Sequence, residues 1–361
     1  MSRVLLINLG SVSTPDIKDV RRYLKEFLSD DEVIDLPKPI QQFILHAFIL
    51  PFRPKRSKAA YERIWTQEGS PLVNNTQKIA DALCRKTGWT VDIAMRYQQP
   101  SMRTAIRNIV KDGVKEIVVV PLYPHNAMAT IGTTRKELNR IVAQIDSNLK
   151  IYFVEPFFDH NAYIDALVGS IRPHITSTTD ILMFSYHGLP ERHLLKADVT
   201  GRHCMNVTEC CSSECSSMRA CYRANVLKSS SLAAKSLGLP NDKWRVSFQS
   251  RVSAIGPKWL SPYTNRELDL HPRVGLNNVV IVCPSFVCDC LETLWEIDIE
   301  GREIFRRAGG NSFTYVPSLN ASPDFINCLE EVIVDARTVS SYDCLLYTSP
   351  SPRDATLSRM P

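Results

Sequence analysis

The chain has 361 residues, a formal net charge of +5 and 44% hydrophobic residues, the balance of a soluble globular protein with one large or two ordinary domains. This composition excludes a disordered chain and a disulfide-stapled miniprotein. The mild charge does not predict nucleic-acid binding, although it permits contact with an anionic membrane surface. No apolar run reaches the roughly 18 residues that a spanning helix needs. The first residues lack a signal-peptide layout, so we expect a cytoplasmic protein.

Short apolar runs alternate with helical patterns along the first half of the chain. Val4–Leu9 is continuously apolar except for Asn8, which predicts a buried parallel strand. In the helix that follows, Thr14 is placed as the N-cap and Pro15 as the first helical residue. The remaining elements expected in this half are strands over Thr90–Met95, Glu116–Leu122 and Lys150–Val154 and helices over Ser101–Lys111 and Thr134–Gln144.

The same alternation repeats in the second half. Expected elements there are strands over Asp180–Tyr186, Trp244–Phe248, Asn278–Cys283 and Ser312–Val316 and helices over Ala224–Leu237 and Glu292–Ala308. Four strands in each half, separated by helices, predict an α/β protein with two doubly wound parallel-sheet domains, 1–155 and 156–317. Ligands of such sheets bind at the carboxyl ends of the strands.

The last residues, 336–361, break this alternation. They have no apolar period, and the segment YTSPSPRDATLSRMP is rich in Ser, Thr and Pro. Such a composition predicts a disordered tail or a segment foreign to the protein. We therefore expect no function from it.

His187 follows the strand expected over Asp180–Tyr186, within the motif SYHGLPER. Gly188 and Pro190 favour a turn directly after it. A histidine at the carboxyl end of a parallel strand points into the ligand crevice, where it could accept a proton or bind a metal. The equally weighted alternative is a histidine that only hydrogen-bonds the turn.

An acidic series follows the strand that ends at Cys283. If Asp289 opens a helix, then Asp289, Glu292, Glu296 and Glu300 lie along one stripe. Such a stripe could guide metal ions or protons through water-filled space. A solvated acidic face is the commoner meaning of this pattern, and the pattern alone favours it.

Residues 40–56, IQQFILHAFILPFRPKR, join an apolar run to a basic cluster. Such a segment could form an amphipathic lip that contacts a membrane or accepts an apolar ligand. An ordinary core helix with a charged end explains the pattern equally well.

Five of the 11 cysteines fall within 18 residues, at Cys204, Cys210, Cys211, Cys215 and Cys221. An odd total without a signal peptide fits a disulfide framework poorly. Clustered thiols in a reducing compartment indicate a metal site in the segment 198–223, with spare reduced cysteines as the alternative.

Several segments together resemble the ferrochelatase family. They include LLINLGSVSTPDIKDVRRYLKEFLSD, YERIWTQEGSPL, SYHGLPERH, SFQSRV and CPSFVCDCLETLWEIDIE, in the family's order. The resemblance implies an enzyme that inserts ferrous iron into a porphyrin in the last step of haem synthesis. It also implies two similar α/β domains around a porphyrin cleft and a C-terminal helix, expected over 318–335, that packs back on them.

The resemblance assigns site residues as well. His187 and Glu292 match the catalytic pair, and these two residues together with Asp289 and Glu296 match the metal-contacting line. The positions that match the porphyrin-binding cleft are Leu9, Arg96, Tyr97, Tyr123 and Trp259. Because two pyrrole N–H protons must leave as Fe²⁺ enters, the reaction needs a base such as neutral imidazole.

Leu9 bears on the substrate. A tyrosine is typical at this position in the family branch that uses coproporphyrin, so Leu9 implies protoporphyrin IX. The alternatives are coproporphyrin, another divalent metal on the same fold, or a non-catalytic carrier of tetrapyrrole or metal. The pair His187 and Glu292 argues against a carrier, because a carrier needs no deprotonating group. The sequence predicts no particular oligomeric state.

The cysteine-rich segment is longer than in plain family members, and some relatives hold a 2Fe-2S cluster. Most of those relatives use a C-terminal cysteine group, which Cys328 and Cys344 alone cannot supply. The resemblance therefore implies an internal cluster with four thiolate ligands, and a zinc site is the alternative. The expected ligands are Cys204, Cys211, Cys215 and Cys221, with Cys210 as the substitute for Cys211. We expect a structural or sensing role.

Overall fold

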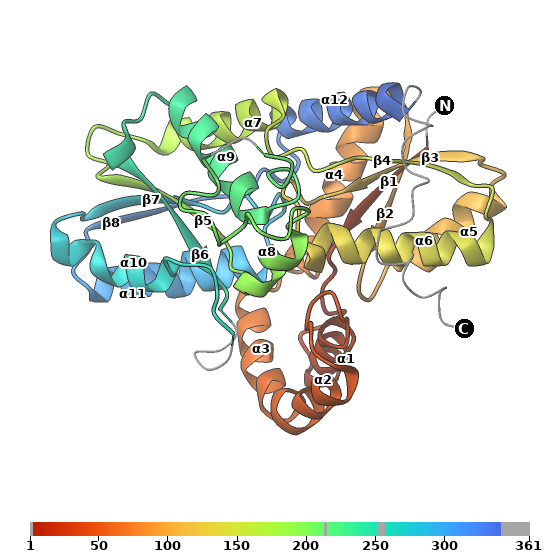
Figure 1. Cartoon of the computed structure of the whole chain (residues 1–361), viewed down its shortest axis with the longest axis horizontal. Helices are drawn as coiled ribbons and strands as arrows, with labels where there is room; N and C mark the ends of the chain where they lie inside the picture. The colour runs from red at the N-terminus through yellow and green to blue at the C-terminus, as the bar shows by residue number, and fades with distance from the viewer. Residues whose placement is uncertain (1–2, 213–214, 252–256, 341–361) are drawn as a thin grey trace.

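The computed structural model describes residues 3–212, 215–251 and 257–340, in which eight parallel strands form two sheets of four. The first sheet has the order β2-β1-β3-β4, with β1 (Arg3–Asn8), β2 (Thr90–Met95), β3 (Glu116–Pro121) and β4 (Lys150–Phe153). The second has the order β6-β5-β7-β8, with β5 (Ile181–His187), β6 (Trp244–Gln249), β7 (Asn278–Val282) and β8 (Ser312–Val316). Both sheets share one topology, which confirms the predicted pair of doubly wound α/β halves (Figure 1).

Helices cover both faces of the first sheet because neighbouring residues of a strand point to opposite sides. Val4 and Leu6 of β1 face the core shared with α4 (Pro71–Thr87) and α12 (Pro323–Ser340). Leu5 and Ile7 face the core shared with α5 (Met102–Lys111) and α6 (Thr133–Ile145).

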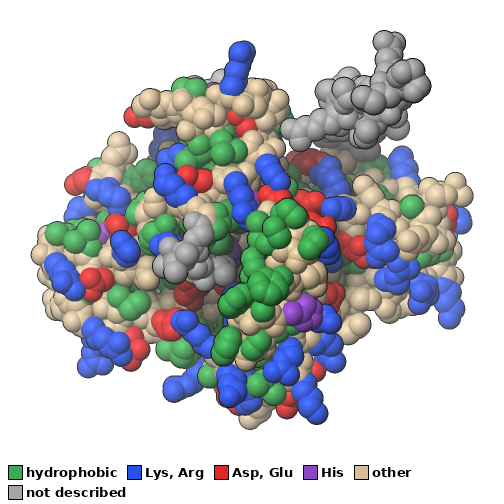
Figure 2. All heavy atoms as spheres, turned by 60° about the horizontal axis from the view of Figure 1, so that its bottom comes forward, with side chains coloured by type: hydrophobic (Ala, Val, Ile, Leu, Met, Phe, Trp, Pro, Cys, Tyr) green, Lys and Arg blue, Asp and Glu red, His purple; other side chains and the backbone are tan. Residues whose placement is uncertain are grey.

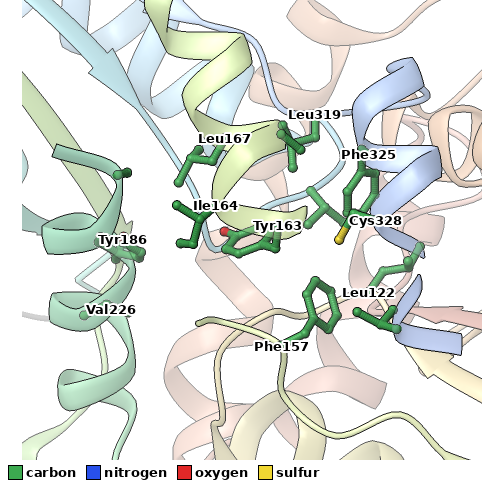
Figure 3. Packing of buried hydrophobic residues seen from close by; sticks show 14 of the residues in the cluster. Leu122, Phe157, Tyr163, Ile164, Leu167, Tyr186, Val226, Leu319, Phe325 and Cys328 are labelled. Atoms are coloured by element: carbon green, nitrogen blue, oxygen red, sulfur yellow. The ribbon is translucent and has the colours of Figure 1, made fainter. Parts of the chain in front are cut away.

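The second sheet is covered in the same way, and one core joins the two sheets. Phe184 of β5 packs on the side of α7 (Asn161–Ile171) and α9 (Tyr222–Ser236). Met183 packs on the side of α10 (Thr264–Leu270) and α11 (Arg302–Arg307). Figure 3 shows Tyr163 of α7 next to Phe325 of α12, so the two halves meet in a continuous apolar interior.

A lobe formed by α1 (Ile17–Leu28), α2 (Lys38–Ile44), the π-helical turn η1 (Leu45–Ile49) and α3 (Leu50–Ile64) projects below the sheets in Figure 1. Its own core includes Val20, Leu24 and Leu45, and Trp295 of the second half packs against it. The remaining elements are η2 (Met128–Gly132), η3 (Arg172–His174), α8 (Glu191–Ala197), η4 (Asn241–Lys243), η5 (Pro272–Val274) and η6 (Glu292–Gly301). Within the described ranges, no helix combines the length and apolarity that a membrane span requires.

The start of α1 differs from the prediction. The N-cap is Asp16, whose carboxylate accepts the backbone N–H of Lys18 at 2.8 Å, and the helix begins at Ile17. Thr14 lies two residues earlier, and its hydroxyl accepts the N–H of Asp16 at 3.3 Å. Aspartate is at least as good an N-cap as threonine, so the later residue takes the position.

The C-terminal helix also differs from its predicted bounds of 318–335. It runs from Pro323 to Ser340 and packs against α7 and α4. Arg337 forms an ion pair with Glu116 of β3 at 3.0 Å. The expected tail therefore does not begin at residue 336, and its remaining part, 341–361, lies outside the described residues.

Candidate active site

His187 is the last residue of β5 and lies half-buried at the carboxyl end of the second sheet. Its Nδ1 lies 2.7 Å from the carbonyl oxygen of Gly188. A carbonyl oxygen only accepts, so Nδ1 carries the proton and Nε2 keeps a free lone pair. Burial lowers the pKa of His187, and the charge of Glu292 opposes this shift only in part. The imidazole is therefore neutral near pH 7 and suited to accept a proton.

The turn after His187 is fixed by a close approach between strands. The N–H of Gly188 donates to the carbonyl of Gln249 at 2.8 Å. A Cβ at position 188 would lie 2.9 Å from that carbonyl oxygen and 3.5 Å from the Trp259 ring. Only glycine fits there, and Trp259, predicted to bind porphyrin, is buried beside this turn.

Gln249 connects the turn to the acidic segment. Its side-chain oxygen accepts the Ser185 hydroxyl at 2.7 Å, and its Nε2 donates to the carbonyl of Glu292 at 2.8 Å. Strand β5 and the start of η6 are thereby held by one buried side chain. The structure thus places His187 and Glu292 at the same end of the sheet, where the Glu292 charge acts on the His187 pKa.

The acidic segment is not the α-helix that the sequence predicts. Glu292–Gly301 forms a π-helix, η6, which continues into α11. The wider π turn changes the angular spacing of Glu292, Glu296 and Glu300, and π segments occur frequently at functional sites. All three carboxylates are partly buried. The face is therefore not simply solvated.

Glu296 has the most perturbed carboxylate of this segment. Burial raises its pKa to about 7, hydrogen bonds from the Ser250 hydroxyl and N–H oppose the shift, and the charges of Glu292 and Glu300 reinforce it. A carboxyl group that is half-protonated near neutral pH can accept and release protons.

Asp289, expected on the metal-contacting line, is bound by several neighbours. Its carboxylate accepts hydrogen bonds from Thr293, from the hydroxyl of Tyr315 at 2.5 Å, from the N–H of Ser318 and from the amide of Asn320 at 2.7 Å. These bonds tie the loop before η6 to the segment after β8. Both oxygens of Asp289 are therefore engaged in bonds that hold the loop before η6, and its expected contact with the metal stays a prediction.

Arg53 is a residue that the sequence did not single out. It lies on α3 of the lobe, and its Nη1 is buried without a hydrogen-bond partner among the described residues. Burial lowers its pKa, and the negative charge of Glu292 opposes this shift. Arg53 belongs to the run 40–56, whose amphipathic pattern indicated a surface lip and gave no sign of a side chain close enough to be influenced by the Glu292 charge.

Tyr23 and Tyr61 complete this side of the site. Both are buried in the lobe, and burial followed by other charges, including that of Glu292, raises the pKa of each phenol. They remain neutral hydroxyls at all ordinary pH values. Both lie in segments that resemble the family, but the resemblance assigned no role to either residue, so sequence reasoning missed them.

The other expected porphyrin contacts are mostly covered. The Arg96 guanidinium pairs with Asp30 and with the Thr133 hydroxyl, and the Tyr97 hydroxyl donates to Asp30 at 2.9 Å. Although burial opposes it, the bonds from Thr133 and the Glu32 N–H and the Arg96 charge together lower the pKa of Asp30.

Three of the residues expected to contact porphyrin are buried or half-buried. Tyr97 and Tyr123 are 1% and 6% exposed, and Leu9 is half-buried against the core of the lobe. Arg96 and Tyr97 are thus held by Asp30, and Leu9 is more exposed than Tyr97 and Tyr123.

The cysteine-rich segment, defined here as the cysteine loop (198–221), is organised around Asp198. This carboxylate accepts the N–H groups of His203 and Cys204 at 2.7 and 2.8 Å and the Ser217 hydroxyl at 2.5 Å. The loop ends at Cys221, the N-cap of α9.

Four thiols of the cysteine loop are neighbours. The Sγ atoms of Cys210 and Cys211 are 4.0 Å apart. The thiol of Cys211, the N–H groups at the start of α9 and the thiol of Cys204 act together against burial to lower the pKa of Cys221 to about 6. Cys215 takes part in no such contact within the described parts of the loop. The grouping therefore includes Cys210 where the sequence predicted Cys215.

No group of three or more His, Cys, Asp or Glu side chains among the described residues is already arranged to hold a metal ion. The donor chemistry nevertheless fits a soft metal, because Cys221 at a helix N-terminus is predisposed to be a thiolate. Binding would require the loop's side chains to rearrange around the metal.

Comparison with known proteins identifies the family. The family model described as Ferrochelatase matches residues 2–337. A ferrochelatase of Opitutus terrae is 44% identical over 331 residues, 90% of this chain and 95% of the relative. One of Pseudomonas fluorescens is 43% identical over 330 residues, with the same coverage. A SirB structure from Bacillus subtilis with Fe³⁺ shares the fold at a TM-score of 0.50, with 12% identity over 95% of this chain and 98% of that one. From the family model and these relatives, the chain belongs to the ferrochelatase family.

Proposed function

We propose that this chain inserts ferrous iron into protoporphyrin IX and forms haem, with His187 as the base and Glu292 as its partner carboxylate. The observation that carries the proposal is the hydrogen bond from Nδ1 of His187 to the Gly188 carbonyl, which leaves Nε2 available to accept a proton. The charge of Glu292 also acts on the pKa of this imidazole. Insertion replaces two pyrrole N–H bonds by bonds to iron, so two protons must leave for each Fe²⁺ that enters. His187 is placed to take the first of them.

The carboxylates of η6 provide a route for protons and iron. Glu292 lies at the site, and Glu296 and Glu300 follow at intervals of four residues along η6. Because the pKa of Glu296 is about 7, this group can relay a proton from the site near neutral pH. A series of partly buried carboxylates also attracts a hydrated dication.

The lobe supplies the features that recognise a porphyrin. Porphyrins present a flat apolar face and carboxylate side chains. The apolar core of the lobe borders the site, and the unpaired Nη1 of Arg53 offers a hydrogen bond to a carboxylate. Leu9, which packs against the core of the lobe, adds apolar surface, and this favours protoporphyrin IX over the more acidic coproporphyrin.

Anaerobic insertion assays test this proposal. The purified chain is mixed with Fe²⁺ and either protoporphyrin IX or coproporphyrin III, and the haem absorption bands are followed. We expect faster turnover with protoporphyrin IX. Faster turnover with coproporphyrin III would overturn the substrate assignment, and binding of porphyrin without insertion would support the carrier alternative.

A resident metal at the cysteine loop is a separate proposal. We propose that Cys204, Cys211 and Cys221, with Cys210 or Cys215 as the fourth ligand, hold a 2Fe-2S cluster, and zinc is the alternative occupant. The neighbouring thiols and the lowered pKa of Cys221 support it. Such a cluster would supply an oxidation-sensitive crosslink within the loop.

The metal content decides between these occupants. Protein purified anaerobically should be reddish and contain about two irons and two sulfides per chain. Colourless protein with one zinc would establish the alternative. Cys210→Ser and Cys215→Ser should be compared, because the thiol contacts of Cys210 predict that its loss removes more metal than the loss of Cys215.

We further propose that the lobe binds an anionic membrane surface from the cytoplasmic side. Ile40, Phe43, Phe48 and Phe52 are 50%, 64%, 60% and 72% exposed. Figure 2, in which the lobe faces the reader, shows hydrophobic side chains gathered along it with lysine and arginine side chains at their edges. An apolar strip flanked by cations is the pattern of interfacial binding.

A basic groove lies next to this strip. It has a volume of about 550 Å³ and is lined by Lys18, Arg21, Arg22, Lys25, His46, Leu50 and Pro51, with no acidic side chain. Sedimentation with vesicles of phosphatidylglycerol and phosphatidylcholine tests the proposal. We expect the combined change of Phe43, Phe48 and Phe52 to Ser to abolish binding and Val274→Ser, at another exposed apolar position, to leave it unchanged. Equal binding of both variants would contradict it.

A further inference from the structure

Tyr222 connects the two functional regions of the second half. It is the first residue of α9, directly after Cys221, and its side chain is 6% exposed. Its hydroxyl donates to the carbonyl of His187 at 3.0 Å and accepts from the Ser285 hydroxyl, also at 3.0 Å. One residue therefore touches the backbone of the candidate base and is bonded covalently to a candidate metal ligand.

The surroundings of Tyr222 leave it little freedom to move. The His125 ring packs edge-on against its ring, with 6.2 Å between centroids. Asn225, one turn later in α9, is buried; its side-chain oxygen accepts the Asn126 N–H, and its amide donates to the carbonyl of Met218 in the cysteine loop. Because the residues after Cys221 are buried and hydrogen-bonded, a displacement of Cys221 also displaces the first turn of α9.

The backbone at His187 is correspondingly sensitive. Tyr222 holds the carbonyl of the peptide that joins His187 to Gly188, and the Nδ1 of His187 is bound to the carbonyl of Gly188 itself. A change in the His187–Gly188 peptide therefore also changes the direction of the imidazole. Loss of the Tyr222 hydroxyl would leave the His187 carbonyl without this donor. The orientation of Nε2 toward the substrate would then be less well defined.

We propose that Tyr222 is a positioning residue that couples the state of the cysteine loop to the orientation of His187. The inference rests on the function proposed for His187 and for the loop. When the thiol of Cys221 is held by its neighbours or by a metal, α9 begins at a fixed place and the hydroxyl of Tyr222 meets the His187 carbonyl. When the loop loosens, that bond weakens and the base is less well oriented.

Tyr222→Phe removes the bond and keeps the ring. We expect kcat to fall about five-fold, the scale of one net hydrogen bond, with KM unchanged because no substrate contact is lost. Tyr163→Phe is the matched control: it is also buried, and its hydroxyl also donates to a backbone carbonyl, that of Pro284, at 2.9 Å. Ser285→Ala, which retains the bond to His187, should have a smaller effect. Equal losses for Tyr222→Phe and Tyr163→Phe would overturn the positioning role.

The coupling itself is tested without activity, by the imidazole NMR signals of protein with labelled histidine. The His187 signal is assigned as the one missing from His187→Ala. We expect Cys221→Ser to shift the His187 signal in the otherwise natural chain and to shift it much less in the Tyr222→Phe background. An unchanged signal in Cys221→Ser, or equal shifts in both backgrounds, would refute the coupling. Because the signal does not depend on turnover, this result stands apart from the outcome of the insertion assay.

Discussion

Two strands of the molecule, β1 and β5, occupy the same place in their sheets, and each is followed by a turn that contains a glycine. In both turns the glycine lies against the backbone at the end of the neighbouring strand. A Cβ on Gly10 would meet the carbonyl oxygen of Tyr97 at 2.0 Å, and a Cβ on Gly188 would meet that of Gln249 at 2.9 Å. The fold therefore forms a close-packed turn with a glycine after the corresponding strand of each sheet.

The residue before each glycine makes the difference. In the first turn it is Leu9, and the neighbouring Asn8 is occupied by bonds to the Leu9 N–H and to Thr76. In the second it is His187, with a free Nε2 and an acidic π-helix beside it. A duplicated architecture thus offers two such turns, and we expect the one that carries His187 to take part in proton transfer.

The largest expected effect comes from exchanging these two residues for alanine. His187→Ala should reduce haem formation to the uncatalysed level, because the base is lost. Leu9→Ala should keep most of the turnover and raise KM for the porphyrin. Both are measured by anaerobic insertion with circular dichroism as the control for folding. Near-normal turnover of His187→Ala would show that the base lies elsewhere.

The acidic π-helix should show a graded effect. Glu292→Gln should lower kcat by about 10²-fold or more, the usual scale for an acid–base group. Glu300→Gln, two turns farther along η6, should cost much less. Similar small losses at both positions would restore the interpretation of a solvated acidic face.

The burial of Glu296 should be measurable in the way the stability of the protein depends on pH. Its pKa is raised in the folded chain to about 7 from an ordinary value near 4.5, so the folded state binds the extra proton between these values. The group's stabilising contribution is present below pH 4.5 and is lost as the pH rises through 7. We expect the decline in Tm from pH 5 to pH 7 to be smaller in Glu296→Gln than in the natural chain. An identical decline would mean that Glu296 is not buried as described.

The smallest effect concerns the end of the chain. Deletion of residues 341–361 should leave Tm and turnover unchanged, because that segment has no apolar pattern. Deletion from Arg337 onward removes the ion pair with Glu116 and should cost on the order of 1 kcal/mol or less. If the shorter deletion were the more harmful, residues beyond 340 would have to stabilise the protein.

Sequence patterns predicted the strands well because buried parallel strands are continuous apolar runs, such as those of β1 and β7. They also located His187, since a strand followed by Gly and Pro specifies where a side chain meets the crevice. The π form of η6 was not predictable, because the residues of this segment carry no pattern that distinguishes a π turn from an α turn.

The remaining site residues depend on tertiary contacts. In the sequence, Asp289 is one carboxylate of a series. Only the structure shows that Tyr315 and Asn320 donate hydrogen bonds to its oxygens. Arg53 comes from a distant lobe, and nothing local distinguishes it from the other cations of its helix. The sequence did not indicate Tyr222 either, because its hydrogen-bond partner His187 is 35 positions away in the chain.

A crystal structure with bound porphyrin tests the central claim most directly. We expect the macrocycle to lie between the lobe and η6. Its nitrogens should face Nε2 of His187, and the carboxylate of Glu292 should lie on the path by which iron reaches them. A carboxylate of the porphyrin should reach Arg53. A macrocycle bound at the turn of Leu9 and Gly10, with His187 out of reach, would contradict the assignment of the chemistry to the turn of His187 and Gly188.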